Sequence, residues 1–481
     1  MKKIILWLLV IAMAVTVLFV GAACKTTTAA ETTAVAETTA AVAETTAAAA
    51  ETTAAAETTA AGGDPFPGAD KANIDWKQFS GQTLNLFMVD HWYTNAIKDH
   101  LAEFENLTGM KVQMEVLAQD PYFQKLRLVL GAGEKSPDVF MAGNLDISQF
   151  ATAGWLEPID SYLDNPKLTD KEWYDYGDIF ATIKKAGTFN EKTYIVGIPT
   201  AEIEMLYYRK DILEQNNVQI PQTFDELYAA AKKLKTDTMS GFVTRAARGV
   251  DGWWEWTGFF LSYGGKFFDA DGKPTFNSPE GVAATEMYVK LLKDTGPAGV
   301  ENYTWTQNVE QFRSGNAVFC VEASGTLPNM IDPEASQIVG KVGYANFPHI
   351  EGKDPSLNYW TWALGMNSKS EKKDAAWLLL EWLSSKGISY QTSITGGAGG
   401  VRTSVMGTKA LEDTFGTEWT NVVIKGLENY TDPPQVPYYM PQVANIADEI
   451  SLSVGNVLLG TETAQQALDN AAKRVEDLLK K

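Results

Sequence analysis

Apolar positions follow two different spacings along the first third of the folded part of the chain. They alternate with other residues over 84–89 and 112–116, which predicts two strands, and a third short strand is expected over 137–141. Between the strands, apolar residues recur every three or four positions over 94–107, and another helix is expected to begin at Asp120. Strands that alternate with helices predict a parallel sheet with right-handed crossovers, so the fold class is α/β.

The same mixture of periods continues towards the C-terminus. Strands are predicted over 194–198 and 205–209, and Thr223 with Glu226 forms a capping box that opens a helix ending near residue 234. Further helices are predicted over 278–293, over about 370–383 and from residue 463 onward. A body of this length, 64–481, exceeds one ordinary core and suits two lobes.

The first 63 residues have a different pattern. Two lysines precede an apolar run over 4–20 and then small residues and Cys24, which is the layout of a bacterial export signal. Cys24 resembles the lipidated cysteine of a lipobox, although Gly21 stands where that motif usually has leucine. Cleavage after Ala23 without lipid and an uncleaved membrane anchor are the alternatives. All three interpretations place the body outside the cytoplasm.

A spacer of low complexity follows the cysteine. Residues 25–63 are almost only alanine, threonine and glutamate, with a recurring Glu-Thr-Thr-Ala unit and no aromatic residue. Such a segment cannot bury enough apolar surface to offset its ordering entropy, and as a flexible coil it would span about 35 Å. We therefore expect a signal peptide over 1–23 and a lipidated cysteine with a disordered tether over 24–63.

Charge and cysteine content narrow the classes of function. The chain has 60 acidic and 40 basic residues, a formal net charge of −20, which argues against binding nucleic acid or an anionic lipid surface. Besides Cys24 there is only Cys320, which lies in an apolar run, so we expect it to be a buried thiol without a disulfide. With three histidines and no Cys/His cluster, we expect neither a metal nor a cofactor.

Short motifs occur in a fixed order along the body. They are LGAG at 130–133 with SPDVF at 136–140, YIVGIP at 194–199, LYYRKDIL at 206–213, PQTFDEL at 221–227, GGKFFDADGK at 264–273, FRSGNAV at 312–318, and GTET at 460–463 with Ala467 and Leu468. In this order they resemble bacterial extracellular solute-binding proteins of family 1, the maltose and multiple-sugar binding components of ABC importers. The resemblance covers almost all of residues 80–481.

The resemblance implies a fold and a set of partners. It implies two α/β lobes with a ligand in the cleft between them, closing by hinge motion around the ligand. One lobe would comprise 64–188 and 366–404, and the other 189–365 and 405–481, with crossings near 184–192, 365 and 402. The closed form would be recognised by the membrane subunits of an ABC importer, and the expected state is a monomer.

Tryptophans are the main candidates for contact with a sugar, because the C–H faces of a carbohydrate stack on aromatic rings. Trp253, Trp254 and Trp256 form the densest group, and Trp360 and Trp362 point the same way if they lie on a strand. Packing in the core is an equally good explanation for each of them. We predict that at least one tryptophan of the first group lines the cleft.

Polar candidates follow the predicted strands. Asp90 and Trp92 come after the first strand and Asn144 after the third, at the edge where open α/β sheets bind ligands. Asp90 could instead cap the next helix. Glu202 is a further candidate, since it shares one face of a strand with Glu204, and a solvated face is the alternative.

Two more candidates lie later in the chain. Glu322 follows the strand of the run 317–321, but the related family often has Gly-Ser-Trp where this chain has ASGT at 323–326, so an aromatic platform is missing there. Arg402 follows a glycine-rich stretch, 396–400, and could bridge hydroxyl groups or form a structural ion pair.

Three classes of function remain open. Glu202 and Glu204 invite a glycoside hydrolase interpretation, which needs two carboxyl groups about 5–9.5 Å apart, but the sequence contains no nucleophile elbow, phosphate loop or metal-ligand spacing. We therefore predict that the protein is not an enzyme, with a scaffolding lipoprotein as a third possibility. As a binding protein it would take a carbohydrate, first an oligosaccharide; the alternative is a polyol or glycerol phosphate, for which Arg245 or Arg402 would matter.

Overall fold

The computed structural model describes residues 65–480 except 353–357, 398–399 and 429–435. The chain divides into two units, 1–63 and 64–481, and the described residues all belong to the second. The predicted signal peptide, the lipidation of Cys24 and the tether lie outside the described residues. Within the described part, the helices are all too short or too polar to cross a membrane.

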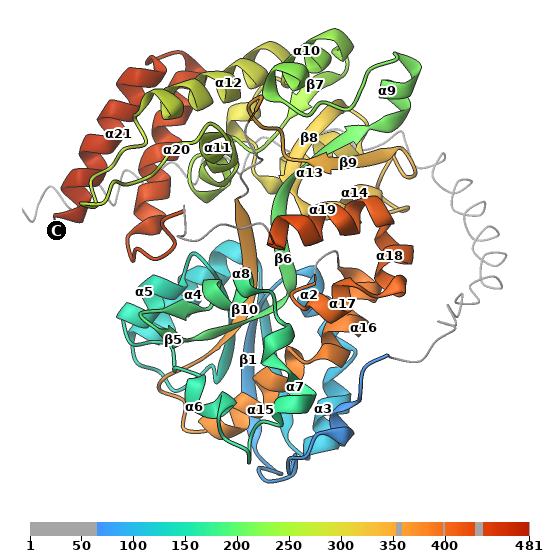
Figure 1. Cartoon of the computed structure of the whole chain (residues 1–481). Helices are drawn as coiled ribbons and strands as arrows, with labels where there is room; N and C mark the ends of the chain where they lie inside the picture. Colours follow the sequence, from blue (N-terminus) through green and yellow to red (C-terminus); the bar gives the residue numbers. More distant parts are fainter. Residues whose placement is uncertain (1–64, 353–357, 398–399, 429–435, 481) are drawn as a thin grey trace, which may run out of the picture. The chain divides into compact units, whose positions relative to one another are not determined.

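A sheet of eight strands runs through the body (Figure 1), in the order β2-β1-β3-β10-β6-β8-β7, with β9 also paired to β6. These strands are β1 (Thr83–Val89), β2 (Lys111–Leu117), β3 (Val139–Gly143), β6 (Ile195–Arg209), β7 (Ser240–Val243), β8 (Ala317–Ala323), β9 (Val342–Asn346) and β10 (Tyr359–Met366). A short hairpin, β4 (Thr188–Phe189) and β5 (Lys192–Thr193), forms a second sheet. The parallel pairing of β1 with β2 and β3 confirms the arrangement predicted for the first strands.

Strand β6 is where the two halves of the sheet meet. Its residues 195–203 pair antiparallel with β10, whereas residues 204–209 pair with β8 and β9. The sequence predicted two strands here, and the structure has one continuous strand of 15 residues, because the intervening residues are also paired and almost all buried. Glu202 and Glu204 lie at the point where β6 changes partners.

Helices cover the first half of the sheet and connect its strands. They are α2 (Trp92–Lys98), α3 (Leu101–Thr108), α4 (Gln119–Gly131), α5 (Ile147–Thr152), α6 (Asp160–Leu163), α7 (Lys171–Tyr174), α8 (Ala181–Ala186), α15 (Lys373–Leu383), α16 (Lys386–Gly396) and α17 (Thr403–Met406). The single helix predicted over 94–107 is two helices, α2 and α3, separated at Asp99 and His100. Gly109, in the left-handed conformation at φ 70°, ends α3.

The remaining helices belong to the middle and the end of the chain. They are α9 (Lys210–Gln215), α10 (Phe224–Leu234), α11 (Val250–Ser262), α12 (Pro279–Thr295), α13 (Trp305–Arg313), α14 (Leu327–Ile331), α18 (Lys409–Phe415), α19 (Thr417–Glu428), α20 (Val443–Leu459) and α21 (Ala464–Leu479). The capping box of Thr223 and Glu226 is present at the start of α10. The C-terminal helices α20 and α21, red in Figure 1, pack against α12, and α20 also contacts α11.

The core is continuous and apolar. Cys320 is fully buried on β8, as predicted from its apolar neighbours. Gly365, near which a crossing between lobes is predicted, pairs with Phe140 of β3 and Ile195 of β6. The limits of the two lobes along the chain stay a prediction.

Two glycine substitutions test how tightly β7 packs against α10. A Cβ atom on Gly241 would lie 2.2 Å from the carbonyl oxygen of Ala231, so backbone would have to move, whereas a Cβ on Gly455 inside α20 would have nothing within 4 Å. We expect Gly241→Ala to lower the free energy of unfolding by about 1–3 kcal/mol. Gly455→Ala should raise it by about 0.5–1 kcal/mol, because alanine favours a helix. Urea denaturation of both variants measures this, and equal effects would contradict it.

Candidate functional site

Five aromatic side chains gather past the end of β1 and over the first residues of β10. His91 and Trp92 follow β1, Phe123 lies on α4, and Trp360 and Trp362 lie on β10. The ring centroids of Trp360 and Trp362 are 5.3 Å apart, those of Trp362 and Phe123 are 5.9 Å apart and stacked, and His91 lies 5.9 Å from Trp362. We call these five residues the aromatic cluster. Of its five rings only Trp362 is buried, and the other four are half-buried, with Trp92 and Trp360 the largest of these.

Glycines let the backbone approach these rings. A Cβ atom on Gly143 of β3 would lie 2.5 Å from the ring of Trp360, and one on Gly397 would lie 1.8 Å from the ring of Trp92. Both distances are shorter than any side chain tolerates, so each position requires glycine for the ring to keep its place. The two rings are therefore held between strand and loop backbone.

A second group of side chains surrounds one guanidinium. Arg245, after β7, donates from Nε to both carboxylate oxygens of Glu322 at 2.9 and 3.1 Å, and from Nη2 to the same carboxylate. Its Nη1 lies 3.3 Å from Asp251, and its Nε lies 3.3 Å from Glu255. The ring of Trp254 lies 4.9 Å from the guanidinium carbon, in cation–π contact. Together with Glu202 and Glu204 of β6 we call these carboxyl groups and Arg245 the arginine cluster.

Burial dominates the ionisation of this cluster. It raises the pKa of Glu202 to about 8, with Arg245 opposing the shift and Glu322 adding to it. Burial also raises the pKa values of Glu204 and Glu255 well above their usual range, and the mutual repulsion of these two carboxyl groups adds to the shift of Glu204. Several of these groups are therefore uncharged acids at neutral pH.

The two clusters meet at Trp360 and Glu202. These residues are direct partners in the antiparallel pairing of β10 with β6, so their side chains share one face of the sheet. The carboxyl group of Glu202 lies against Gly325, where a Cβ atom would be 2.3 Å from its Oε1. It is half-buried, and the ion pairs of Arg245 go to Asp251, Glu255 and Glu322 instead. We take this junction as the candidate site.

Some polar atoms near the junction lack hydrogen-bond partners among the described residues. Asn144 is fully buried; its Nδ2 donates to the carbonyl oxygen of Tyr359, while its Oδ1 has no hydrogen-bond partner among the described residues. Both carboxylate oxygens of Glu204 and the Nε1 atoms of Trp92 and Trp254 also lack a hydrogen-bond partner among the described residues. Buried polar atoms are nearly always paired in folded proteins, so this concentration of exceptions is typical of a place that a ligand or water completes.

The structure separates the remaining predicted site residues. Asp90 is exposed, and the cap of α2 is His91, whose ring accepts from the backbone N–H of Tyr93; the alternative that Asp90 caps this helix is therefore wrong. Trp256 is fully buried, stacks on Phe260 at 4.8 Å and donates to Thr285. Trp253 is equally buried.

Arg402 lies in neither cluster. It is fully buried, and it donates to the carbonyl oxygens of Ser384 and Asp175, each at 2.9 Å, with Tyr174 beneath the guanidinium. Its contact with a ligand stays a prediction, as it does for Trp253 and Trp256.

Some members of the site were missing from the sequence-based set. Phe123 gave no separate signal, because its spacing on the helix is that of an ordinary core residue. His91 follows the first strand together with Asp90 and Trp92, so its place in the sequence pointed to the same edge of the sheet but not to a role of its own. Glu255 did carry a signal: it is a carboxylate between Trp254 and Trp256, in the middle of a largely apolar helix. A charge in such a run calls for a buried partner, and Arg245 provides it. Among the described residues, no group of acidic, histidine or cysteine side chains could hold a metal ion.

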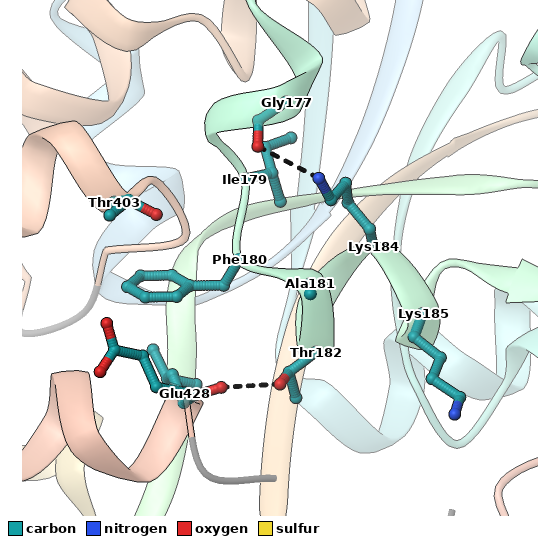
Figure 2. A pocket seen from close by; sticks show the side chains of 10 residues that line it. Gly177, Ile179, Phe180, Ala181, Thr182, Lys184, Lys185, Thr403 and Glu428 are labelled. Atoms are coloured by element: carbon teal, nitrogen blue, oxygen red, sulfur yellow. Dashed lines mark hydrogen bonds between the residues drawn. The ribbon is translucent and has the colours of Figure 1, made fainter. Parts of the chain in front are cut away.

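A separate cavity of about 450 Å³ lies between α8 and the end of α19 (Figure 2). Lys184 donates to the carbonyl oxygen of Gly177 at its edge, and Thr182 donates to that of Leu427. None of the predicted ligand residues lines it. We therefore place the site at the Trp360–Glu202 junction, where a stacking surface and unpaired polar atoms occur together.

Known proteins resemble this chain over most of its length. A model of the family described as bacterial extracellular solute-binding protein matches residues 91–388. An erythritol/L-threitol-binding protein of Mycolicibacterium smegmatis is 28% identical, and the match covers 70% of this chain and 74% of that protein. A mannitol-binding protein of Pseudomonas aeruginosa is 24% identical, and the match covers 76% of this chain and 85% of that protein.

Solved structures agree with these relatives. A ribitol-bound solute-binding protein from Agrobacterium radiobacter has a TM-score of 0.75 and 28% identity, covering 83% of this chain and 99% of its own. The maltose-bound MalE3 protein of T. maritima has a TM-score of 0.72 and 26% identity, covering 82% and 99%. The predicted α/β fold of two lobes is confirmed by these matches.

Substituting Gly143 tests the packing of the aromatic cluster. In Gly143→Ala the added methyl group would overlap the ring of Trp360, so the ring must move away from Trp362. Because two tryptophans in edge contact couple strongly, we expect a clear change in the near-ultraviolet circular dichroism. Gly131→Ala is the control, since its Cβ would meet only the ring of Trp155 at 3.4 Å. An unchanged spectrum in Gly143→Ala would contradict the described packing.

Proposed function

We propose a function from one premise: the chain belongs to the bacterial extracellular solute-binding protein family. Membership places it outside the cytoplasm and makes it a solute-binding protein that works with an ABC transporter. We propose that it captures a small neutral polyhydroxylated solute, first a sugar alcohol and otherwise a sugar, at the Trp360–Glu202 junction. The protein would then deliver this solute unchanged to the membrane subunits of an ABC importer.

The single observation that carries the proposal is the pairing of an aromatic ring, Trp360, with a carboxyl group, Glu202, that stands outside the ion pairs of Arg245. Trp360 offers a face to C–H groups, while Glu202 and the free Oδ1 of Asn144 offer polar atoms to hydroxyl groups. Small ligand sites combine apolar walls with a few placed polar groups in this way. Relatives that bind erythritol or mannitol and a ribitol-bound structure support a polyol.

The amount of free ring surface supports a small ligand over a long one. Trp362 is only 5% exposed and stacks on Phe123, so its face is already used, and the other four rings of the cluster are all partly covered. A long oligosaccharide would need a longer row of exposed rings. A short sugar is the second candidate, because the similar MalE3 protein of T. maritima was solved with maltose bound.

The ionisation of the acidic pair does not favour hydrolysis. A retaining glycosidase needs one ionised carboxylate as nucleophile beside a protonated acid. Burial raises the pKa values of both Glu202 and Glu204, so neither is set apart as the ionised partner. For the rest of the protein we propose a lipid anchor at Cys24, a tether over 25–63 and a monomeric state, on the sequence pattern alone.

A thermal-shift screen tests the proposed class of ligand. The panel is erythritol, ribitol, D-mannitol, D-glucitol, maltose, maltotriose and glycerol 3-phosphate. A ligand at one hundred times its dissociation constant adds about 2.7 kcal/mol to the free energy of unfolding, which the melting temperature reports. We expect a shift with at least one polyol and recovery of that polyol unchanged. A shift only with glycerol 3-phosphate, or with no compound, would contradict the proposal.

Replacing Trp360 tests where the ligand binds. Trp360→Ala removes the stacking surface, and we expect the dissociation constant of the polyol found by the screen to rise about 10–100-fold, equivalent to about 1.4–2.7 kcal/mol. Trp173→Ala is the matched control, because Trp173 is also half-buried but lies on α7 beside Trp76. Calorimetric titration of both variants measures the effect. Equal affinities in the two variants would move the site elsewhere.

A further inference from the structure

One cation faces five carboxyl groups in the arginine cluster. They lie on two strands and one helix around the segment that carries Arg245. Glu202 and Glu204 are on β6, Glu322 is on β8, and Asp251 and Glu255 are on α11. The hydroxyl group of Tyr288 on α12 donates to the carbonyl oxygen of Arg245 and adds no charge. Even with several carboxyl groups protonated, the cluster has no excess positive charge to offer a ligand.

The guanidinium is also covered. Glu322 takes its Nε and one Nη2 donor, Asp251 faces its Nη1, and Trp254 lies over the planar group at 4.9 Å. A protein that binds a phosphate or carboxylate presents a guanidinium fork or an ammonium group to it. Arg245 instead has its charge balanced by carboxylates on two edges.

Among the described residues, the two basic side chains at the aromatic cluster are either neutral or balanced by a carboxylate. Burial lowers the pKa of His91 to about 3, so its ring is neutral. Arg127 lies 5.0 Å from the ring of Phe123 but forms an ion pair with the buried Asp146 at 2.9 Å. Ring faces beside a carboxyl group form an environment that attracts a cation, because the faces of aromatic rings carry negative partial charge.

We propose that the junction selects solutes by charge: it accepts neutral polyols, prefers a polyol that carries an ammonium group, and rejects one that carries a phosphate, with Glu202 setting this order. This inference rests on the proposed function, because it assumes that the solute contacts Trp360 and Glu202. The ammonium group would pair with the carboxylate of Glu202 and lie on the ring of Trp360. Among the described residues, a phosphate there would meet the carboxyl groups of the arginine cluster and a guanidinium whose charge they already balance.

Selection by charge implies that binding of the ammonium ligand is coupled to loss of a proton from Glu202. Burial holds the pKa of Glu202 near 8, so at pH 7 its carboxyl group is mostly protonated. An ammonium ligand pairs with the ionised form, so its binding releases about one proton, whereas a neutral polyol can bond to either form. The affinity for the ammonium ligand should therefore rise with pH up to about 8 and then level off. The groups that face Glu202 in this range are those of the arginine cluster named above.

The test uses matched ligands on the complete protein. Two series share a carbon chain: D-glucitol, 1-amino-1-deoxy-D-glucitol and D-glucitol 6-phosphate, and ribitol with its 1-amino-1-deoxy and 5-phosphate derivatives. At pH 8 we expect the amine to bind about 10-fold more tightly than its neutral parent and the phosphate about 100-fold more weakly. Titration at pH 7 in two buffers of different ionisation enthalpy should show about one proton released by the amine and almost none by the parent.

A variant assigns the effect to Glu202. Glu202→Gln keeps the shape of the side chain and removes its charge, so the ratio of amine to parent affinity should fall to about 1 and the proton release should vanish. Glu334→Gln, at an exposed position, is the control for the change in net charge. Should Glu202→Gln not fold, the wild-type series and its proton release still decide the question.

The outcomes separate this inference from the proposed function. If both neutral parents and the whole neutral panel fail to bind, the proposed function fails and this inference fails with it. If a neutral polyol binds but its phosphate binds as tightly, or the preference for the amine persists in Glu202→Gln, only the inference is overturned.

Discussion

The continuous path of β6 through the sheet is the constraint on which the site depends. One strand pairs with β10 over its first nine residues and with β8 and β9 over the rest, so its middle cannot shift without breaking both halves. Because side chains two apart on a strand point the same way, Glu202 and Glu204 are directed into the same interior space. The register that buries the apolar residues of β6 thereby fixes where these two carboxyl groups lie.

Burying these groups is costly, and neighbouring residues reduce the cost. Gly258 on α11 leaves room for Glu204, since a Cβ atom there would lie 1.8 Å from its Oε2. Arg245 offsets part of the burial of the carboxyl groups around it, and protonation offsets the rest. A core designed for stability alone would contain apolar residues here. The expensive arrangement is therefore better explained by binding than by folding.

The sequence predicted most of the fold, because local pattern and motif order are strong signals. The parallel strands, the capping box at Thr223 and the family were all found from it. It missed the continuity of β6, since the polar Glu202 and Glu204 interrupt the apolar pattern that marks a buried strand. It also predicted one helix over 94–107 where the structure has two, because no glycine or proline marks the break at Asp99 and His100.

The candidate site was harder to predict, because burial and contact are properties of the tertiary structure. Trp253, Trp254 and Trp256 look alike in sequence, yet Trp254 lies on Arg245 while Trp256 stacks on Phe260. The pairing of Trp360 with Glu202 joins residues 158 positions apart, which no local pattern contains. What the sequence could supply was the chemical type of each residue.

Arg245 shows why the chemical type of a residue is not enough to infer a ligand. In the sequence alone, an arginine near a predicted site suggests an anionic group such as a phosphate. In the structure its donors face Glu322 and Asp251 and its face is covered by Trp254, so its charge stabilises the protein's own carboxyl groups. A free guanidinium would bind phosphate by charge-assisted hydrogen bonds stronger than any made by a neutral hydroxyl. If the proposed neutral polyol is the ligand, the pairing of Arg245 with Glu322 and Asp251 removes that competition at this guanidinium.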